Sequence, residues 1–241
     1  MPLPYYVSPE QMMQDKAEYA KKGIAKGRSI VAMEYDHGIL LVADNPSSLS
    51  KISEIYDRIA FSGAGRYSEF ENLRKAGIRH ADMKGYLYSR DDVNAKSLVN
   101  AYSQVLGTVF SQEIKPLEVE ILVVSVGFNS EENEIYRISF DGSIFDEKRF
   151  TVIGGKAEAI LTYLKNRAPS PPANSNGDTA VVREPLVSLS EAIQICVDAI
   201  GEGNHQKPSQ KGLEVSVLDW SQKGRVFRRL TASELVQYLQ R

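Results

Sequence analysis

The chain has 241 residues, of which 42% are apolar and 25% are charged, and its net charge is −2. These values are typical of a globular protein with a substantial core, in one large domain or two small ones. Because the sequence has neither a block of basic residues nor a run of about eighteen apolar residues, we expect no nucleic-acid partner and no membrane partner.

Two further features indicate the compartment. The single cysteine, Cys196, excludes an intrachain disulfide framework and suits a reducing cytosol. The opening segment MPLPYYVSPEQMMQ lacks the basic and apolar regions of a secretion signal. We therefore expect the protein in the cytoplasm.

The first helix has a clear start. Ser8 is a suitable N-cap, Pro9 suits the first helical position, and Gln11 stands three residues after Ser8, as in a capping box. We expect the helix to run from Pro9 to Lys22 and to stop at Gly23. The segment before it, with two prolines and two tyrosines, predicts an extended, mobile tail.

Runs rich in Val, Ile and Ala predict strands in the middle of the chain, and apolar residues at helical spacing predict helices. In chain order we expect strands at Ser29–Glu34, Ile39–Ala43 and Asp57–Ala64, helices at Ser68–Met83 and Asp91–Glu113, and strands at Val119–Val126, Glu134–Ser139, Ser143–Phe145 and Phe150–Ile153. A helix at Ala157–Lys165 precedes a segment rich in Pro, Ser and Asn, which predicts an exposed insertion at about residues 166–187.

The last part of the chain has two more capping boxes. They predict helices at Leu189–Ile200 and Ala232–Gln240, separated by a polar loop and by strands at Leu213–Asp219 and Arg225–Leu230. Blocks of strands that alternate with blocks of helices favour an α+β fold with antiparallel sheets and helices on the outer faces. We assign residues 1–8 to the tail and residues 9–241 to a single domain.

The common cofactor and metal motifs are incomplete. The turn at Phe61 to Gly65 has two glycines of a dinucleotide-binding fingerprint, but Ser68 stands at the third. The three histidines have no paired spacing of the kind that binds zinc. Cys196 lies on an apolar helix stripe, which favours a buried structural thiol over a nucleophile. We expect no cofactor and no metal.

The segment from Arg28 to Gly65 resembles the opening of a 20S proteasome core subunit, with two strands joined at Asp36–Gly38 and a later strand that enters a glycine turn. In the catalytic β-type subunits, the first strand begins with a threonine nucleophile, and Arg28 stands at that position here. A guanidinium cannot act as a nucleophile at neutral pH. The chain therefore resembles the non-catalytic α type, in its actinobacterial form, because Ser8 begins a Ser-Pro-Glu-Gln sequence.

The resemblance covers almost the whole chain and implies the four-layer αββα sandwich of N-terminal nucleophile hydrolases. It also implies a homo-heptameric ring that caps rings of catalytic β subunits, without chemistry of its own. Such a ring templates assembly, restricts entry to unfolded chains, and docks activators such as hexameric ATPase rings through the activators' carboxyl-terminal tails.

The resemblance assigns two sites. Lys51 corresponds to a lysine that pairs with the terminal carboxylate of an activator in a pocket between neighbouring subunits, which Glu18 and Gly63 also line. The gate comprises the tail and its support, at Tyr5, Tyr6, Ser8, Pro9 and Tyr19. From composition alone, Lys51 is a solvated loop lysine and the tail is plain disorder. The tail also lacks the Tyr-Asp-Arg sequence of archaeal α subunits, which leaves the closed-gate contacts open.

Two other functions fit parts of the sequence. An active hydrolase of the same fold would use Ser29 as its nucleophile after removal of residues 1–28, which requires cleavage after an arginine. A small-molecule-binding module would use the incomplete glycine turn.

Overall fold

The computed structural model describes residues 8–168, 186–206, 208–209 and 212–239. Within these ranges the strands form two five-stranded sheets whose pairs are all antiparallel. Sheet A has the order β10-β9-β2-β1-β8, with bounds Phe227–Arg229, Leu213–Asp219, Gly38–Asp44, Ile30–Tyr35 and Phe150–Ile153. Sheet B has the order β3-β4-β5-β6-β7, with bounds Ile52–Tyr56, Ile59–Gly65, Val119–Ser125, Glu134–Ile138 and Ile144–Glu147.

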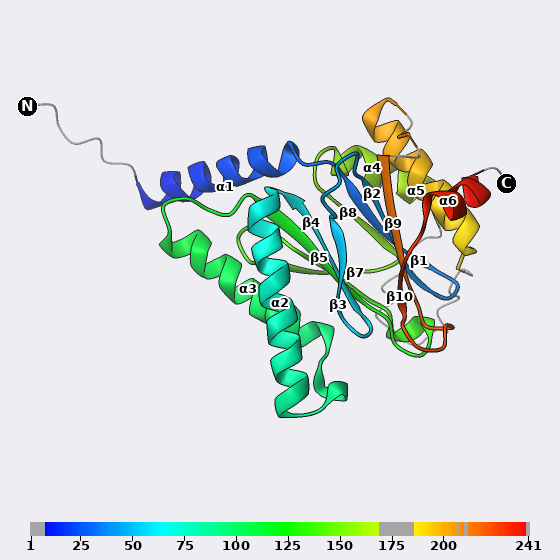
Figure 1. Cartoon of the computed structure of the whole chain (residues 1–241). Helices are drawn as coiled ribbons and strands as arrows, with labels where there is room; N and C mark the ends of the chain where they lie inside the picture. The colour runs from blue at the N-terminus through cyan, green and yellow to red at the C-terminus, as the bar shows by residue number, and fades with distance from the viewer. Residues whose placement is uncertain (1–7, 169–185, 207, 210–211, 240–241) are drawn as a thin grey trace, which may run out of the picture.

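The helices, with the exception of α1, cover the outer faces of the two sheets (Figure 1). They are α1 (Pro9–Ala25), α2 (Tyr67–Leu87), α3 (Ala95–Gln112), α4 (Ala157–Arg167), α5 (Leu189–Asn204) and α6 (Ala232–Leu239). Two short 3₁₀ turns lie at Arg90–Asp92 and Ser130–Glu132. Helices α4, α5 and α6 pack on sheet A, and α2 and α3 pack on sheet B.

The alternation of side chains along β1 explains why four layers form. Val31 and Met33 point into the core beneath α4 and α5, whereas Ile30 and Ala32 point into the core between the sheets. Successive side chains of a strand face opposite sides of the sheet, so a strand that is apolar on both sides must be covered on both sides. The predicted four-layer αββα sandwich is therefore confirmed.

Helix α1 lies outside these layers and contacts β4 and β5 (Figure 1). Its buried residues Ala20 and Ile24 pack with Phe140 in a small separate core. Gly23 is buried against Glu118, where an added Cβ would lie 2.2 Å from a carboxylate oxygen. Since α1 buries few side chains, this close contact is a large share of what holds the helix to the sheet.

Three strand or helix bounds of the sequence analysis were wrong. The strand expected at Asp57–Ala64 is β4 and begins only at Ile59, because Asp57 is in a hairpin turn with a φ of +33°; the preceding strand of the hairpin, β3, was not predicted. The helix expected from Asp91 begins at Ala95, because the Asn94 side chain caps α3 and Ser89 caps a separate 3₁₀ turn. The last strand is shorter than expected, Phe227–Arg229.

Two helices continue past the ends that were expected for them, Lys22 and Ile200. Helix α1 passes Gly23 and ends at Ala25, and α5 passes Gly201 and Gly203 and ends at Asn204. An added Cβ at Gly203 would lie 2.4 Å from the Ile160 side chain of α4. Gly23 and Gly203 therefore permit close packing inside helices and are not C-caps.

The predicted helix caps are present. Ser8 and Ser188 each accept a bond from the backbone of the third following residue. Thr231 and Glu234 form the full reciprocal box, in which the Thr231 backbone N–H donates to Glu234 at 2.7 Å. Of the helices in the described ranges, none combines the length and the apolar character that crossing a membrane requires.

Candidate functional site

Arg28, which stands where catalytic β-type subunits have their threonine, lies in the connection between α1 and β1. The backbone is fixed just before it, because Gly27 N donates to Ile24 O at 2.8 Å and Gly155 N donates to Gly27 O at 2.8 Å. An added Cβ at Gly27 would lie 2.7 Å from the backbone nitrogen of Gly65. Arg28 is therefore an internal residue of a tightly packed connection, and its nitrogen is part of a peptide bond.

The Arg28 side chain is paired with a buried carboxylate. Its Nη1 donates to Asp44 Oδ2 at 2.7 Å, and the Asp44 side chain is only 7% exposed. Asn204, at the end of α5, donates to the same oxygen at 3.2 Å. A guanidinium stays charged at every physiological pH, so this end of β1 and β2 holds an ion pair and no nucleophile.

A polar hollow of about 450 Å³ lies beside this ion pair. Among its lining residues are Arg28, Asp44, Pro46, Asn204, Pro208 and Gly212. Gln206 and Ser209 complete the lining, and no histidine or lysine stands beside the Ser209 hydroxyl among these described lining residues. The hollow lies at the position that corresponds to the nucleophile, where this chain has Arg28.

Lys51 also contacts Arg28, through the Arg28 backbone. Its Nζ donates to the Arg28 backbone oxygen at 3.3 Å. Within the described ranges, no carboxylate lies within 4.0 Å of the Lys51 Nζ. Burial lowers the pKa of Lys51, the carboxylates of Asp44 and Glu214 oppose this effect, and the Arg28 charge adds to it. Lys51 is thus a partly buried cation whose own chain gives it a carbonyl as partner.

Glu214 fixes the loop that carries Lys51, and the sequence analysis missed it. This buried carboxylate accepts bonds from Lys51 N at 2.8 Å, Ile52 N at 3.2 Å, Asn45 Nδ2 at 2.7 Å and Arg229 Nη1 at 2.7 Å. A buried carboxylate with several donors is a rigid anchor. The signal in the sequence was a glutamate inside the apolar strand LEVSVLD.

Gly63 lies beneath Lys51 and is itself buried. Its backbone N–H donates to the Lys51 carbonyl at 3.2 Å, which joins the start of β3 to β4. An added Cβ at Gly63 would lie 2.6 Å from the Phe70 ring of α2. The structure therefore brings Lys51 and Gly63 together, with Phe70 on the far side of the glycine.

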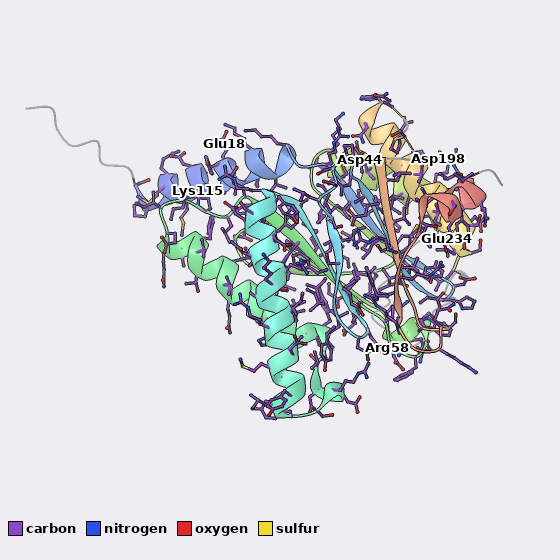
Figure 2. All side chains as sticks on the ribbon, in the orientation of Figure 1. Glu18, Asp44, Arg58, Lys115, Asp198 and Glu234 are labelled. Atoms are coloured by element: carbon purple, nitrogen blue, oxygen red, sulfur yellow. The ribbon has the colours of Figure 1, made fainter. Side chains whose placement is uncertain are left out.

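Glu18 lies on a different element. It is on α1, is 65% exposed, and pairs with Lys22 at 2.7 Å, a contact that lowers the pKa of Glu18. Figure 2 shows Glu18 on α1 and Asp44 at the end of β2, well separated. No hydrogen bond or ion pair joins Glu18 to Lys51 in the described part of the chain.

The predicted gate residues lie at the start of α1 or before it. Ser8 is the N-cap and accepts a bond from Gln11 N at 3.2 Å, and Pro9 is the first helical residue. Tyr19 is 47% exposed, and its ring lies 6.0 Å from the Lys115 Nζ. Tyr5 and Tyr6 lie outside the described residues.

The alternative nucleophiles are buried. Ser29 is 2% exposed, and its hydroxyl donates to the Gly155 carbonyl. Cys196 is fully buried with its sulfur 3.7 Å from that of Met33, and burial raises the pKa of its thiol. Among the described residues, no group of His, Cys, Asp and Glu is arranged to hold a metal ion.

The comparisons with known proteins agree with this geometry. Residues 24–218 match the family model described as proteasome subunit. The chain is 48% identical over 237 residues to proteasome subunit alpha of Saccharomonospora viridis, covering 98% of this chain and 89% of that protein. It is 48% identical over 243 residues to proteasome subunit alpha of Thermobifida fusca, covering 100% of this chain and 92% of that protein. The chain therefore belongs to the proteasome subunit family and is similar throughout its length to the α type.

Proposed function

We propose that this chain is a non-catalytic α subunit, which forms the outer ring of a cytoplasmic proteasome core while partner β subunits perform the catalysis. The observation that carries the proposal is the ion pair of Arg28 with Asp44 at the position of the nucleophile. An internal arginine offers neither a hydroxyl nor a free amine, and both are needed by an N-terminal nucleophile. No observation favours the hydrolase that would use Ser29.

The second part of the proposal is that Lys51 docks an activator through the carboxylate at the end of an activator tail. The Lys51 ammonium has no carboxylate partner in the described chain, and Glu214 and Gly63 fix the backbone on either side of it. A charge-assisted bond to a terminal carboxylate suits such a site. Because Glu18 lies on α1 and makes no hydrogen bond or ion pair with Lys51 in the described chain, we propose that a pocket lined by both takes Glu18 from a neighbouring copy in the ring.

The third part concerns passage through the ring. Residues 1–8, with Pro9 and Tyr19 as support, form a gate that restricts entry to unfolded chains. The support for this role is that the N-cap of α1 is formed at Ser8, the last residue of the predicted tail.

The test is Lys51→Ala in a core assembled with one catalytic subunit and driven by a hexameric ATPase activator ring. Loss of the charge-assisted bond costs about 1.5–3 kcal/mol per pocket, or about tenfold to a hundredfold in affinity. Several tails on one ring multiply the effect. Activator-driven degradation of an unfolded protein should therefore be lost, and Lys51→Arg should restore it only in part.

Lys165→Ala is the matched control, because Lys165 is an exposed lysine on α4, away from the site. It should degrade the protein at the wild-type rate. Cleavage of a small peptide without activator should be the same in all these variants. If Lys51→Ala supports activator-driven degradation as well as Lys165→Ala does, the docking assignment is wrong.

A further inference from the structure

The side chains of Arg28 and Lys51 both contribute a positive charge near the buried carboxylate of Asp44. Asp44 accepts from Arg28 Nη1 at 2.7 Å, and Lys51 Nζ donates to the backbone oxygen of the same Arg28 at 3.3 Å. Of the two carboxylates whose charges act on Lys51, Asp44 acts more strongly than Glu214. Lys51 therefore lies beside the residue that pairs with Asp44, although its nitrogen makes no ion pair with Asp44 in the described structure.

Burial makes this competition matter. A buried carboxylate is costly unless a cation or several donors satisfy it. Asp44 receives one donor from Arg28 and one from Asn204, and both approach the same oxygen, Oδ2. Glu214, by contrast, already has four donors. Without the Arg28 guanidinium, the described residues would leave Asp44 with the neutral amide of Asn204, and Lys51, whose Nζ lies 3.3 Å from the Arg28 backbone oxygen, is a neighbouring cation.

We propose that Arg28 is a positioning residue that occupies Asp44 and so leaves the Lys51 ammonium available for a partner's carboxylate. That Lys51 serves a partner's carboxylate rests on the docking role proposed above, whereas the competition between Arg28 and Lys51 for Asp44 does not. On this account the arginine that replaces the nucleophile has a task of its own. It prevents an ion pair between Lys51 and Asp44 that would compete with docking.

The competition can be measured without an activator. The full chain, labelled with [ε-¹³C]lysine, is titrated by NMR as wild type, Arg28→Ala, Asp44→Asn and Arg28→Ala/Asp44→Asn, and Lys51→Arg assigns the Lys51 signal. If Arg28 occupies Asp44, the Asp44→Asn change lowers the Lys51 pKa little in the wild-type background. In the Arg28→Ala background it lowers that pKa by about one pH unit more, because Lys51 then pairs with Asp44 directly.

The four variants distinguish a direct ion pair between Lys51 and Asp44 from repulsion of Lys51 by Arg28 through space. If Arg28 only repels Lys51 through space, the two substitutions add, and Asp44→Asn has the same effect in both backgrounds. Equal effects overturn the proposal. Arg28→Lys is the matched control, because it keeps a cation beside Asp44, and the Lys51 pKa should stay near its wild-type value. Arg28 is 55% exposed on its side chain and Asn is isosteric with Asp, so these variants should fold.

The docking consequence is tested in the assay with the ATPase ring. Arg28→Ala should weaken activator-driven degradation about tenfold per site, the competition that corresponds to a coupling of about one pKa unit between Lys51 and Asp44. The double variant Arg28→Ala/Asp44→Asn should restore it. A wild-type rate for Arg28→Ala, or no restoration in the double variant, overturns the docking consequence. If Lys51→Ala has no effect while the NMR cycle shows the coupling, the docking role fails and the competition for Asp44 stands.

Discussion

The charge of Lys51 gives docking a defined pH dependence. Burial lowers the pKa of Lys51 from its ordinary 10.5. Only the ammonium form bonds to a carboxylate, so docking should be full below the lowered pKa and lost as the pH rises through it. Activator-driven degradation should therefore decline at a pH below the ordinary lysine value.

The measurement is the ratio of activator-driven degradation to unstimulated peptide cleavage across the alkaline range. The ratio removes the pH dependence of the catalytic subunit itself. Lys51→Arg should show a weaker but flat ratio over the same range, because arginine stays charged. A wild-type ratio as flat as that of Lys51→Arg would show that Lys51 titration does not limit docking.

Gly63 should tolerate no side chain. An added methyl group at Gly63 would lie 2.6 Å from the Phe70 ring, inside the core between α2 and sheet B. Overpacking of this kind costs about 1–3 kcal/mol. Gly63→Ala should lower the melting temperature by several degrees, at about 2–4 °C per kcal/mol for a chain of this size.

Gly107→Ala is the matched control for that change. Gly107 is inside α3, and the nearest atom to an added Cβ is the Asp141 backbone oxygen at 3.5 Å, an ordinary contact. Alanine is a better helix former than glycine by about 1 kcal/mol, so this variant should melt slightly higher. Equal melting temperatures for the two variants would contradict the packing described at Gly63.

The site was predictable from single residues only where a resemblance supplied a role. Arg28 was predicted to be no nucleophile, and the structure gives the reason that a pattern cannot, namely its bond to Asp44. Glu214 and Asn204 are far in sequence from the residues that they contact. The pairing of β2 with β9 places Glu214 beside Lys51, and the length of α5 places Asn204 beside Asp44. Long-range contacts of this kind have no local signal.

At the level of elements, the order and type of most strands and helices followed from the sequence. The failures concerned one glycine and one hairpin. Gly23 was expected to end a helix, but it is a close-packing position within α1. Strand β3 was missed because the hairpin turn at Asp57 lies in a continuous run of strand-forming residues. A glycine's role depends on what packs against it, and sequence alone does not show that.

Helix α1 should depend on the absence of a side chain at Gly23. In Gly23→Ala, the new methyl group would lie 2.2 Å from a Glu118 oxygen and 2.7 Å from its Cβ. Glu118 would have to leave its ion pairs with Arg66, at 3.3 Å, and Lys115, at 3.2 Å. We expect faster amide hydrogen exchange in α1, with little change in the two sheets.

Lys21→Ala is the control for α1, because Lys21 is exposed on the same helix and the change also adds a good helix former. Its amide exchange in α1 should match or fall below that of the wild type. Unchanged exchange in Gly23→Ala would mean that the contact with Glu118 does not hold the helix in place.

At the scale of the whole molecule, the tail should act only after a ring has formed. Deletion of Met1–Val7 leaves the cap at Ser8 and all of α1. The ring should therefore assemble as before, and small peptides should enter the core faster. Peptide hydrolysis by the wild-type and shortened subunits, each paired with the same catalytic subunit, measures the difference. Equal rates would show that the tail is not a gate.

The central claim is that this chain is the non-catalytic outer ring of a proteasome core. Its most direct test is electron cryomicroscopy of the particle formed when the full chain is co-expressed with a catalytic proteasome subunit. The account predicts sevenfold outer rings of this chain, with density continuous from α1 through Arg28 into β1. Particles in which this chain forms the inner rings and begins at residue 28 or 29, with a free amine at the hollow beside Asp44, would contradict it.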